Sequence, residues 1–548
     1  MHGVAEDRLE SWKQIAAYLN RGVRTVRRWE TQEGLPVHRH MHRSLGSVFA
    51  FKSEIDAWLE TRPAHLVPRV SDEMHGGTEA SRLVTSIAVL PFANLSVDPE
   101  NAYFADGLTE EVIADLSKLQ ALRVISRTSS MAFKDTKKDL KWIARELGVR
   151  YILQGSVRRA GKQLRVAAQL IDAIRDDHLW AESYDGTLED VFAIQERLAR
   201  LIVAALELEL THDEQRRLAE RPIRDVHAYE CFLRARHEAW RWRPDAIAHA
   251  IQLLHNGLAI VGDNARLYAA LGHTYLQYRE AGIDMGEQAL AEAERCADKV
   301  FALEPRSAPG FRLRGWIQYS RGRIQDAVRS LNAALELDPN DADTLLLLCN
   351  CYLISGKVPA ARPLIDRVQM VDPLTPIVRC LPGFADGSEG DLESAVEPYR
   401  QMLDMDPNNP MARLFYVWVL ALTGRHDTIV RVLDGFSLAE RNTVPARAAR
   451  FLARAVATRQ PDALDLVTPE MEAAAGSNDV FARFLAEGYA ITGAVEDAIR
   501  WLSVAVDRGY TNYPFLARYD PCFEPVRTHP RFQRLLETVR ERWERFEV

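Results

Sequence analysis

Apolar and polar positions follow three different rhythms along the 548-residue chain. Near the N-terminus, apolar residues recur every three to four positions, which predicts short helices. Between about residues 86 and 172, short apolar runs and a two-residue alternation predict strands. In the second half, proline and glycine recur with a period of 34, at Pro305, Pro339, Pro373, Pro407, Gly322, Gly356, Gly390 and Gly424. The pattern therefore predicts a multidomain protein in which three folds follow one another.

The first region, residues 8–62, has the spacing of a small helical module with a hairpin. Ser11 and Gln14 fit a capping box, and the apolar positions that follow predict a helix to about Leu19. After a break containing Gly22, a second helix is expected from about Val23 to Glu30, which gives a helix-turn-helix. Two strands are expected around Ser44-Leu45-Gly46, and a capped helix then starts at about Ser53, so the helix-turn-helix is winged.

Charge is concentrated in this module. The whole chain carries a formal charge of −8, yet residues 20–43 hold six arginines and two glutamates. This local excess of positive charge is what a surface for DNA phosphates requires. The alternative is a solvated basic helix in a small protein-interaction domain.

The stretch SWKQIAAYLNRGVRTVRRWETQEGLPVHRH, with GSVFAFKSEIDAWL after it, resembles the MerR/excisionase-type winged helix of bacterial regulators. The resemblance implies double-stranded DNA as a partner. It places four residues at the major groove: Arg24, Thr25, Arg27 and Arg28. It places four wing residues near phosphates or the minor groove: His38, Arg39, His40 and Arg43. His38, His40 and His42 could share one strand face, but no carboxylate or cysteine completes a metal set, so we expect no metal site.

Residues 63–85 contain proline, glycine and polar residues, and they are expected to form a linker. Residues 86–212 are expected to form an α/β domain with a mixed sheet. Its expected strands are Ser86–Phe92, Leu122–Ser126, Val149–Arg158 and Gln163–Asp172, with a hairpin at Ala160-Gly161. Its expected helices are Thr109–Leu119, Asp139–Leu147 and Asp190–Leu210.

This region, from SIAVLPF to VFAIQERLA, resembles the TolB N-terminal-like domain, which implies a binding or coupling domain rather than a catalyst. The glycine-containing stretch 155–162 is not a phosphate-binding loop, because five residues separate its glycines and Gln163 follows Lys162. His178, Trp180 and Tyr184 could line a pocket, although core packing fits them better. No pair of nucleophile and base appears by spacing, so we expect no enzyme and no cofactor.

Residues 225–512 resemble tetratricopeptide repeats. Small residues such as Gly315 and Ala327 permit close helix crossing, and Asp-Pro pairs such as Asp338-Pro339 separate the units. An insertion falls at about residues 282–286, the stretch 442–476 is degenerate, and residues 513–548 are expected to form a helical cap. Stacked repeats form a concave groove, which implies a protein or peptide partner, or alternatively a scaffold for oligomerisation.

Composition sets the remaining limits. The chain is 47% hydrophobic and 27% charged, and its six cysteines are sparse, so reduced core thiols are expected. No signal segment and no apolar run of about 18 residues appears, which predicts a cytoplasmic protein without a membrane anchor. The sequence thus predicts a DNA-binding transcriptional regulator that forms a homodimer. The alternative is a protein-interaction scaffold that does not bind DNA.

Overall fold

The computed structural model describes residues 8–9, 11–18, 35–39, 48–55, 85–280, 287–438 and 440–548. The chain divides into two compact units, residues 1–81 and residues 82–548. Among the described residues, no helix combines the length and the apolar character needed to cross a bilayer. The expected insertion at 282–286 lies outside the described residues.

The described part of the first unit contains helix α1, a small antiparallel sheet, and helical residues 52–55, where a helix was expected to start at about Ser53. Helix α1 spans Trp12–Tyr18, and the Ser11 Oγ accepts a hydrogen bond of 3.2 Å from the Gln14 backbone N–H, as the capping pattern predicts. Strand β3 (Val48–Phe51) pairs with β2 (His38–Arg39), which confirms a hairpin, and also with β1 (Arg8–Leu9), which was not predicted. The predicted second helix, Val23–Glu30, lies outside the described residues.

The second unit begins with a mixed sheet in the order β6-β4-β7-β8-β9, with β5 beside β7. The strands are β4 Thr85–Val89, β5 Ala93–Asn94, β6 Leu122–Val124, β7 Tyr151–Ala160, β8 Gln163–Asp172 and β9 Asp177–Thr187. Strand β4 runs parallel to β6 and β7, whereas β7, β8 and β9 are antiparallel. The predicted hairpin is confirmed, with Ala160 opposite Gln163. Strand β9 was missed because only Tyr184 of its residues is fully buried, so its alternation is weak.

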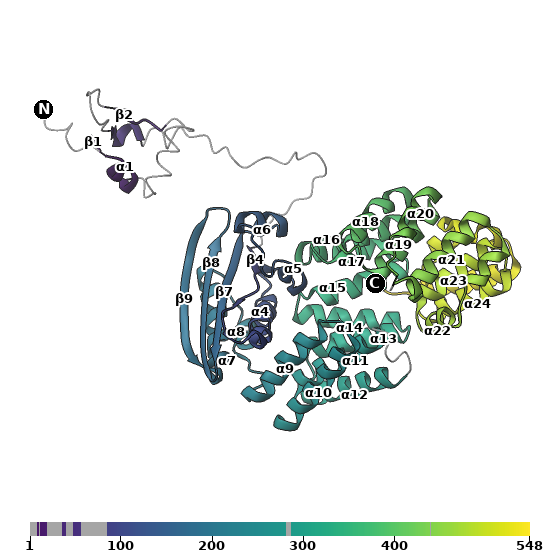
Figure 1. The fold of residues 1–548 in the computed structure, drawn as a ribbon, viewed down its shortest axis with the longest axis horizontal. Helices are drawn as coiled ribbons and strands as arrows, with labels where there is room; N and C mark the ends of the chain where they lie inside the picture. Colours follow the sequence, from purple (N-terminus) through teal and green to yellow (C-terminus); the bar gives the residue numbers. More distant parts are fainter. Residues whose placement is uncertain are drawn as a thin grey trace. The chain divides into compact units, whose positions relative to one another are not determined.

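Helices cover both faces of this sheet. They are α4 Ala102–Ser117, α5 Arg127–Met131, α6 Leu140–Leu147, α7 Val191–Ala205 and α8 His212–Ala219. Helices α4 and α7 share one apolar core with the start of the repeats, and α6 packs on a separate core (Figure 1). Helix α4 begins at Ala102, seven residues before the predicted start at Thr109. Its first half includes Gly107, which lies so close to Leu233 of α9 that a Cβ there would be 2.7 Å from that side chain.

The predicted helix to Leu210 was too long. Helix α7 ends at Ala205, and Glu207 then adopts a φ of +52°, a left-handed conformation that a helix cannot continue through. His178 and Trp180 lie on β9 with Tyr184, and only Tyr184 is fully buried. The Tyr184 ring belongs to the core shared with α4 and α7, which favours packing over a pocket role for this residue.

The repeats form consecutive helix pairs stacked in chain order (Figure 1). The helices are α9 Val226–Ala239, α10 Pro244–Val261, α11 Ala265–Glu280, α12 Glu287–Leu303, α13 Ala308–Ser320, α14 Ile324–Leu337, α15 Ala342–Ile354, α16 Val358–Val371, α17 Pro376–Ser388, α18 Leu392–Met405, α19 Pro410–Leu422, α20 His426–Asp434, α21 Val444–Thr458, α22 Pro469–Ser477, α23 Asp479–Ile491 and α24 Val495–Asp507. Each Asp-Pro pair lies between units, as predicted, because proline cannot continue the preceding helix.

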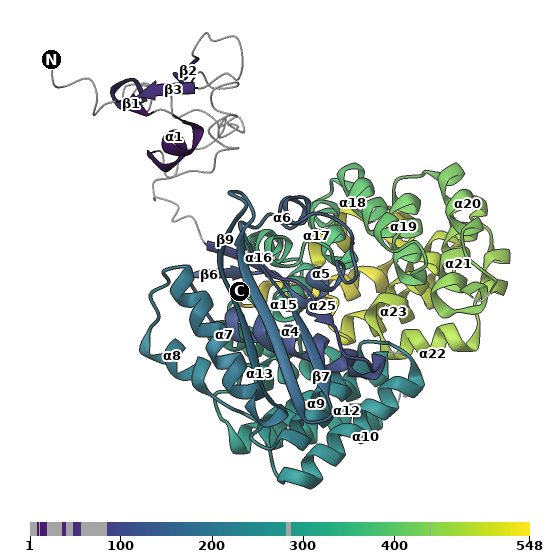
Figure 2. The ribbon, with the colours of Figure 1, turned by 60° about the vertical axis from the view of Figure 1, so that its left-hand side comes forward.

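The C-terminal segment does more than cap the last repeat. It contains the π-helical turn η5 (Phe515–Tyr519), the 3-10 turn η6 (Pro521–Val526) and helix α25 (Pro530–Arg545), which lies near α15 in Figure 2. Asn512 Nδ2 donates to the Leu353 carbonyl at 3.2 Å, and Trp543 Nε1 donates to the Gly356 carbonyl at 3.2 Å. The segment therefore returns to the middle repeats and bonds to the turn after α15.

Candidate functional site: a cavity between the repeats and the α/β domain

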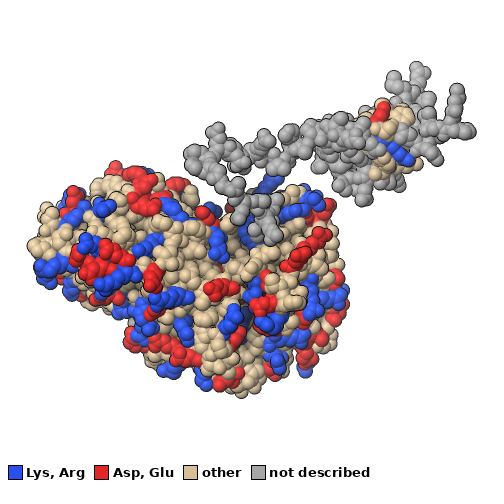
Figure 3. All heavy atoms as spheres, turned by 180° about the vertical axis from the view of Figure 1, so that it is seen from behind, with Lys and Arg blue, Asp and Glu red and all other residues tan. Residues whose placement is uncertain are grey.

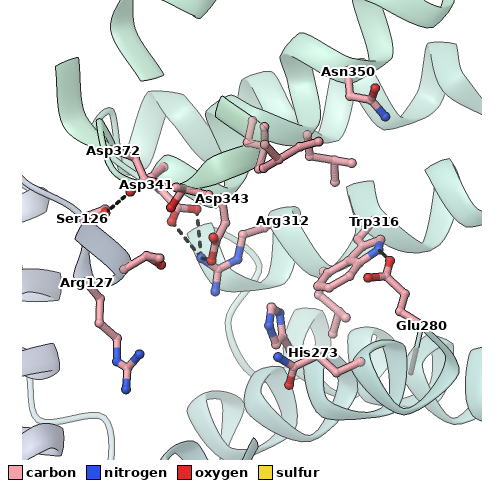
Figure 4. A pocket seen from close by; sticks show the side chains of 18 of the residues that line it. Ser126, Arg127, His273, Glu280, Arg312, Trp316, Asp341, Asp343, Asn350 and Asp372 are labelled. Atoms are coloured by element: carbon pink, nitrogen blue, oxygen red, sulfur yellow. Dashed lines mark hydrogen bonds and ion pairs between the residues drawn. The ribbon is translucent and has the colours of Figure 1, made fainter. Parts of the chain in front are cut away.

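A cavity of about 620 Å³ lies on the inner side of the repeats (Figure 4). Helices α9, α11, α13, α15, α17 and α23 contribute lining residues, and so do α4 and α5 of the α/β domain. Cavities of this size commonly hold a ligand or a short segment of a partner. The cavity is therefore the strongest candidate binding site in the described part of the second unit.

Paired arginines and carboxylates occupy the side of the cavity next to the α/β domain. Arg312 of α13 donates to Asp341 at 2.8 Å, and its nearest approach to Asp343 is 3.6 Å. Glu110 of α4 receives both Arg127, at 3.0 Å, and Arg236. Figure 4 shows Arg312 extending toward Asp341 and Asp343, with Arg127 entering from α5. These arginines are held by internal carboxylates, which fixes their positions.

Aromatic rings surround these charges. The guanidinium of Arg127 lies 4.0 Å from the ring centre of Trp240. His273 packs edge-on against Trp316, with ring centres 4.9 Å apart, and Trp316 Nε1 donates to Glu280 at 2.9 Å. Rings held by these contacts on packed helices give the cavity a fixed shape, as a binding site requires.

Burial shifts the pKa of several groups in the cavity. It lowers the pKa of His273 well below its usual range, and Arg312 and Arg236 lower that pKa further, so the ring is neutral at pH 7. Glu280 is an exposed residue, yet the protein packed around its carboxyl raises the pKa of that group to about 7. Burial also raises the pKa of Asp479 to about 6. The cavity thus disfavours charge that lacks a partner.

Two repeat turns fasten the α/β domain to the wall of the cavity. The Ser126 backbone N–H donates to the Val371 carbonyl at 2.6 Å, and the Leu374 backbone N–H donates to Ser129 Oγ at 2.9 Å. One repeat earlier, Asn340 Nδ2 reaches the Leu122 carbonyl at 3.0 Å. These bonds hold α5 against the repeats. The wall of the cavity is therefore built by the α/β domain and the repeats together.

The residues predicted to bind DNA are placed only in part. Arg24, Thr25, Arg27, Arg28, His40 and Arg43 lie outside the described residues, and His38 and Arg39 lie on β2. His38 Nε2 is 2.6 Å from Glu54 Oε2, and its ring stacks on Phe49 with centres 5.2 Å apart. Sequence reasoning found no carboxylate to complete a metal set with the three histidines, and it did not consider Glu54, 16 positions from His38. The described residues contain no group of three or more metal-ligating side chains.

The surface of the second unit carries both signs of charge. Figure 3 shows lysine and arginine interspersed with aspartate and glutamate over the described atoms on one face. A mixed surface of this kind supports solubility and short-range pairing rather than attraction of a polyanion. On that face, the repeats offer no extended basic surface for DNA.

Both regions that line the cavity are similar to known domain families. Residues 83–201 match the second domain of HilA/YgeH-like transcriptional regulators. The α/β region is thus similar to a regulator domain. Tetratricopeptide-repeat families match residues 288–342 and 318–379. The second unit therefore joins a regulator-like α/β region to a tetratricopeptide-like solenoid.

A curated relative from Rhizobium meliloti (strain 1021) is described as putative adenylate cyclase 3. It is 44% identical over 218 residues, which cover 39% of this chain and 37% of the relative. The chain thus spans little more than a third of that relative's length. Among solved structures, a thermophilic tetratricopeptide-repeat protein of Thermus thermophilus is 18% identical with a TM-score of 0.29, covering 35% of this chain and 98% of its own. TolB from Acinetobacter baumannii is 19% identical with a TM-score of 0.18, covering 22% and 28%.

Proposed function

We propose that the chain is a cytoplasmic, DNA-binding transcriptional regulator whose repeats bind a protein partner. The observation that carries this proposal is the match of residues 83–201 to a domain of transcriptional regulators. The basic N-terminal module supplies the DNA-binding part, and Arg24, Thr25, Arg27 and Arg28 read the duplex. In this proposal the chain is not an enzyme.

The hydrogen bonds between the α/β domain and the repeats support a coupling role. Asn340 and Asp372 belong to successive repeat turns, and both bond to the α/β domain. A partner that binds the repeats would therefore act on the α/β domain directly, since the two share one apolar core. Coupling of this kind needs two binding sites and one structural element whose conformation changes when either site is occupied.

Capture of genomic DNA fragments by the purified full chain tests the proposal. We expect enrichment of a limited set of duplex sites, and affinity for those sites should fall steeply with salt, by about one log unit of slope for each phosphate contact. The double variant Arg27→Ala/Arg28→Ala should lose this binding. Arg145→Ala/Arg158→Ala is the matched control, because both arginines are exposed in the second unit and the charge change is equal.

Two results would contradict the proposal. One is capture no greater than that of residues 82–548 alone. The other is equal loss of binding in the test and control variants. Either result would favour the protein-interaction scaffold that does not bind DNA.

A further inference from the structure

The cavity also indicates the chemistry of the partner, an inference that rests on the proposed binding of a protein by the repeats. Its lining includes eight carboxylates and five arginines, and no lysine. The carboxylates therefore outnumber the basic groups. The lining includes residues of helices from α9 to α23, so the cavity extends over several repeats.

The arginines beside the α/β domain already form close ion pairs within the protein, whereas two carboxylates in the cavity do not. Arg127 and Arg236 pair with Glu110, and Arg312 pairs with Asp341. In contrast, the Asp343 side chain is 59% exposed, and its only ion pair among the described residues is the 3.6 Å contact with Arg312. Asp479 is buried, lines the cavity and forms no ion pair among the described residues. Asp343 and Asp479 therefore keep acceptor capacity for a basic group.

The side chain of Gln277 independently indicates that the cavity needs a hydrogen-bond donor. Its side chain lines the cavity and only 5% of the residue is exposed. Its Oε1 has no hydrogen-bond donor within the described protein. A buried carbonyl oxygen without a donor is costly, so such groups are usually satisfied by a ligand or by water. A donor supplied by an occupant would remove this cost.

Aromatic side chains complete a site for cations. Trp316, Tyr319, Phe384 and Phe415 line the cavity together with these carboxylates. Trp242 also lines it, is 47% exposed and has a φ of +49°, which is unusual for a bulky residue. Ring faces attract ammonium and guanidinium groups, and nearby carboxylates add charge pairing. The combination favours a basic occupant over an acidic one.

The two under-used carboxylates are separated along α15. Asp343 lies in the first turn of that helix. Asp479 lies toward its other end. One turn after it on α23, Arg483 donates to the Tyr510 hydroxyl at 3.4 Å, and the next residue, Thr511, donates its backbone N–H to the Ile354 carbonyl at the end of α15. At about 1.5 Å of rise per residue, Asp343 and the start of the last turn of α15, at Cys351, are roughly 12 Å apart along the axis. An extended chain covers that distance in roughly four residues, at about 3.3 Å each.

We propose that the cavity binds an extended segment of a partner protein that carries two lysines or arginines about four residues apart. One basic side chain pairs with Asp343 and the other with Asp479. The apolar side chains between them contact Leu346, Leu347 and Phe384, which lie in the same lining. Gln277 Oε1 accepts a hydrogen bond from the segment.

Fluorescence anisotropy with the full chain tests this inference. The probe is a labelled, capped peptide with two lysines four residues apart and leucines between them, and the comparison peptide has glutamate in place of lysine. We expect the lysine peptide to bind at least tenfold more tightly than the glutamate peptide. Asp343→Asn should weaken binding about threefold, because Asp343 is partly exposed, and Asp479→Asn should weaken it at least tenfold.

Asp366→Asn is the matched control, because Asp366 is exposed on α16 and does not line the cavity. It should leave peptide affinity unchanged. Asp343→Asn keeps the test decisive if Asp479→Asn fails to fold. Three results would overturn the inference: equal binding of both peptides, wild-type affinity in both test variants, or binding of spermidine with none of the lysine peptide.

The DNA capture described above separates the two ideas. Normal DNA capture with no peptide selectivity would refute only the basic segment. Peptide selectivity with no DNA capture would refute the regulator and keep the basic partner.

Discussion

Ser129 Oγ donates a hydrogen bond of 2.7 Å to Asp372 Oδ1, although 243 positions separate the two residues in the chain. Ser129 lies in α5 of the α/β domain, and Asp372 belongs to an Asp-Pro pair between two repeats. The hydroxyl of Ser126 donates to the same carboxylate oxygen. A residue that ends a repeat helix thereby also fastens the α/β domain to the solenoid.

Replacement of this carboxylate should loosen the connection. Asp372→Ala leaves two hydroxyl groups at the buried contact without their acceptor, so we expect a loss of about 2–4 kcal/mol in the free energy of unfolding, measured by urea denaturation. Asp406→Ala is the control, because Asp406 occupies the equivalent position one repeat later and bonds to Asn409 within its own turn. It should cost about 1 kcal/mol. Equal losses in the two variants would show that the contact with α5 contributes nothing.

The glycine turns provide a second matched pair. Gly356 has a φ of +64°, and a Cβ there would lie 2.7 Å from Asn512 Oδ1 of the returning C-terminal segment. Gly424 has a φ of +67°, but a Cβ there would meet nothing within 4 Å. Gly424→Ala should therefore cost only the left-handed strain, about 1 kcal/mol, whereas Gly356→Ala should cost about 1–3 kcal/mol more.

Thermal unfolding followed by circular dichroism measures both variants. If Gly424→Ala destabilised the chain as much as Gly356→Ala, the C-terminal segment would not pack on this turn as the structure shows. The difference between the two variants therefore tests where the C-terminal segment packs, independently of whether the repeats are helical.

Local patterns predicted the elements well, because their causes lie within a few residues. The 34-residue period placed the Asp-Pro breaks, and the turn at Ala160-Gly161 set the register of β7 and β8. Asp139 was the expected start of a helix, and its carboxylate accepts a hydrogen bond from the Trp142 backbone N–H. Each of these features depends on backbone geometry near the residue concerned.

The cavity could not be predicted in the same way, because distant segments build it. Arg312 and Asp341 come from adjacent repeats, and Arg127 comes from another domain. The C-terminal segment returns to Gly356 through contacts that no local pattern encodes. A usable signal was present at Arg312, a charged residue on a repeat helix among small and apolar positions. That signal indicates that the Arg312 guanidinium faces the inside of the repeats, but it does not identify Asp341 as its partner.

A buried carboxyl in the last repeats predicts a dependence of stability on pH. Glu487 is fully buried, and neither of its carboxylate oxygens reaches a hydrogen-bond partner in the described structure. Burial, and then Asp520, raise the pKa of Glu487 well above its usual value near 4.5, and they outweigh Arg483, 3.6 Å from Glu487 Oε1, and Trp418, which lower it. A pKa raised by folding means that stability is fully present below about pH 4.5 and is lost as the pH rises through the raised value.

The variant Glu487→Gln removes this titration. We expect it to match the native chain at pH 5 within about 1 kcal/mol, and to be more stable at pH 9 by about 1–3 kcal/mol, in urea unfolding at both pH values. Glu336→Gln is the control, because Glu336 is exposed on α14. It should leave the pH dependence unchanged. A native chain that is equally stable at both pH values would contradict the assignment of a neutral Glu487.

The last prediction concerns the number of chains on DNA. A single DNA-binding module of this size buries roughly 600–1,000 Å² of protein surface, which is usually too little for selective binding to a genome. Two modules on one site raise the effective concentration of the second contact. We therefore expect a homodimer that binds two half-sites, paired through the second unit, with isolated residues 1–65 binding at least tenfold more weakly. Light scattering of the full chain should give twice the mass of one chain without DNA, and two chains plus one duplex with DNA. A monomer in both states that binds as tightly as residues 1–65 would refute the dimer, because a single module would then account for all of the affinity.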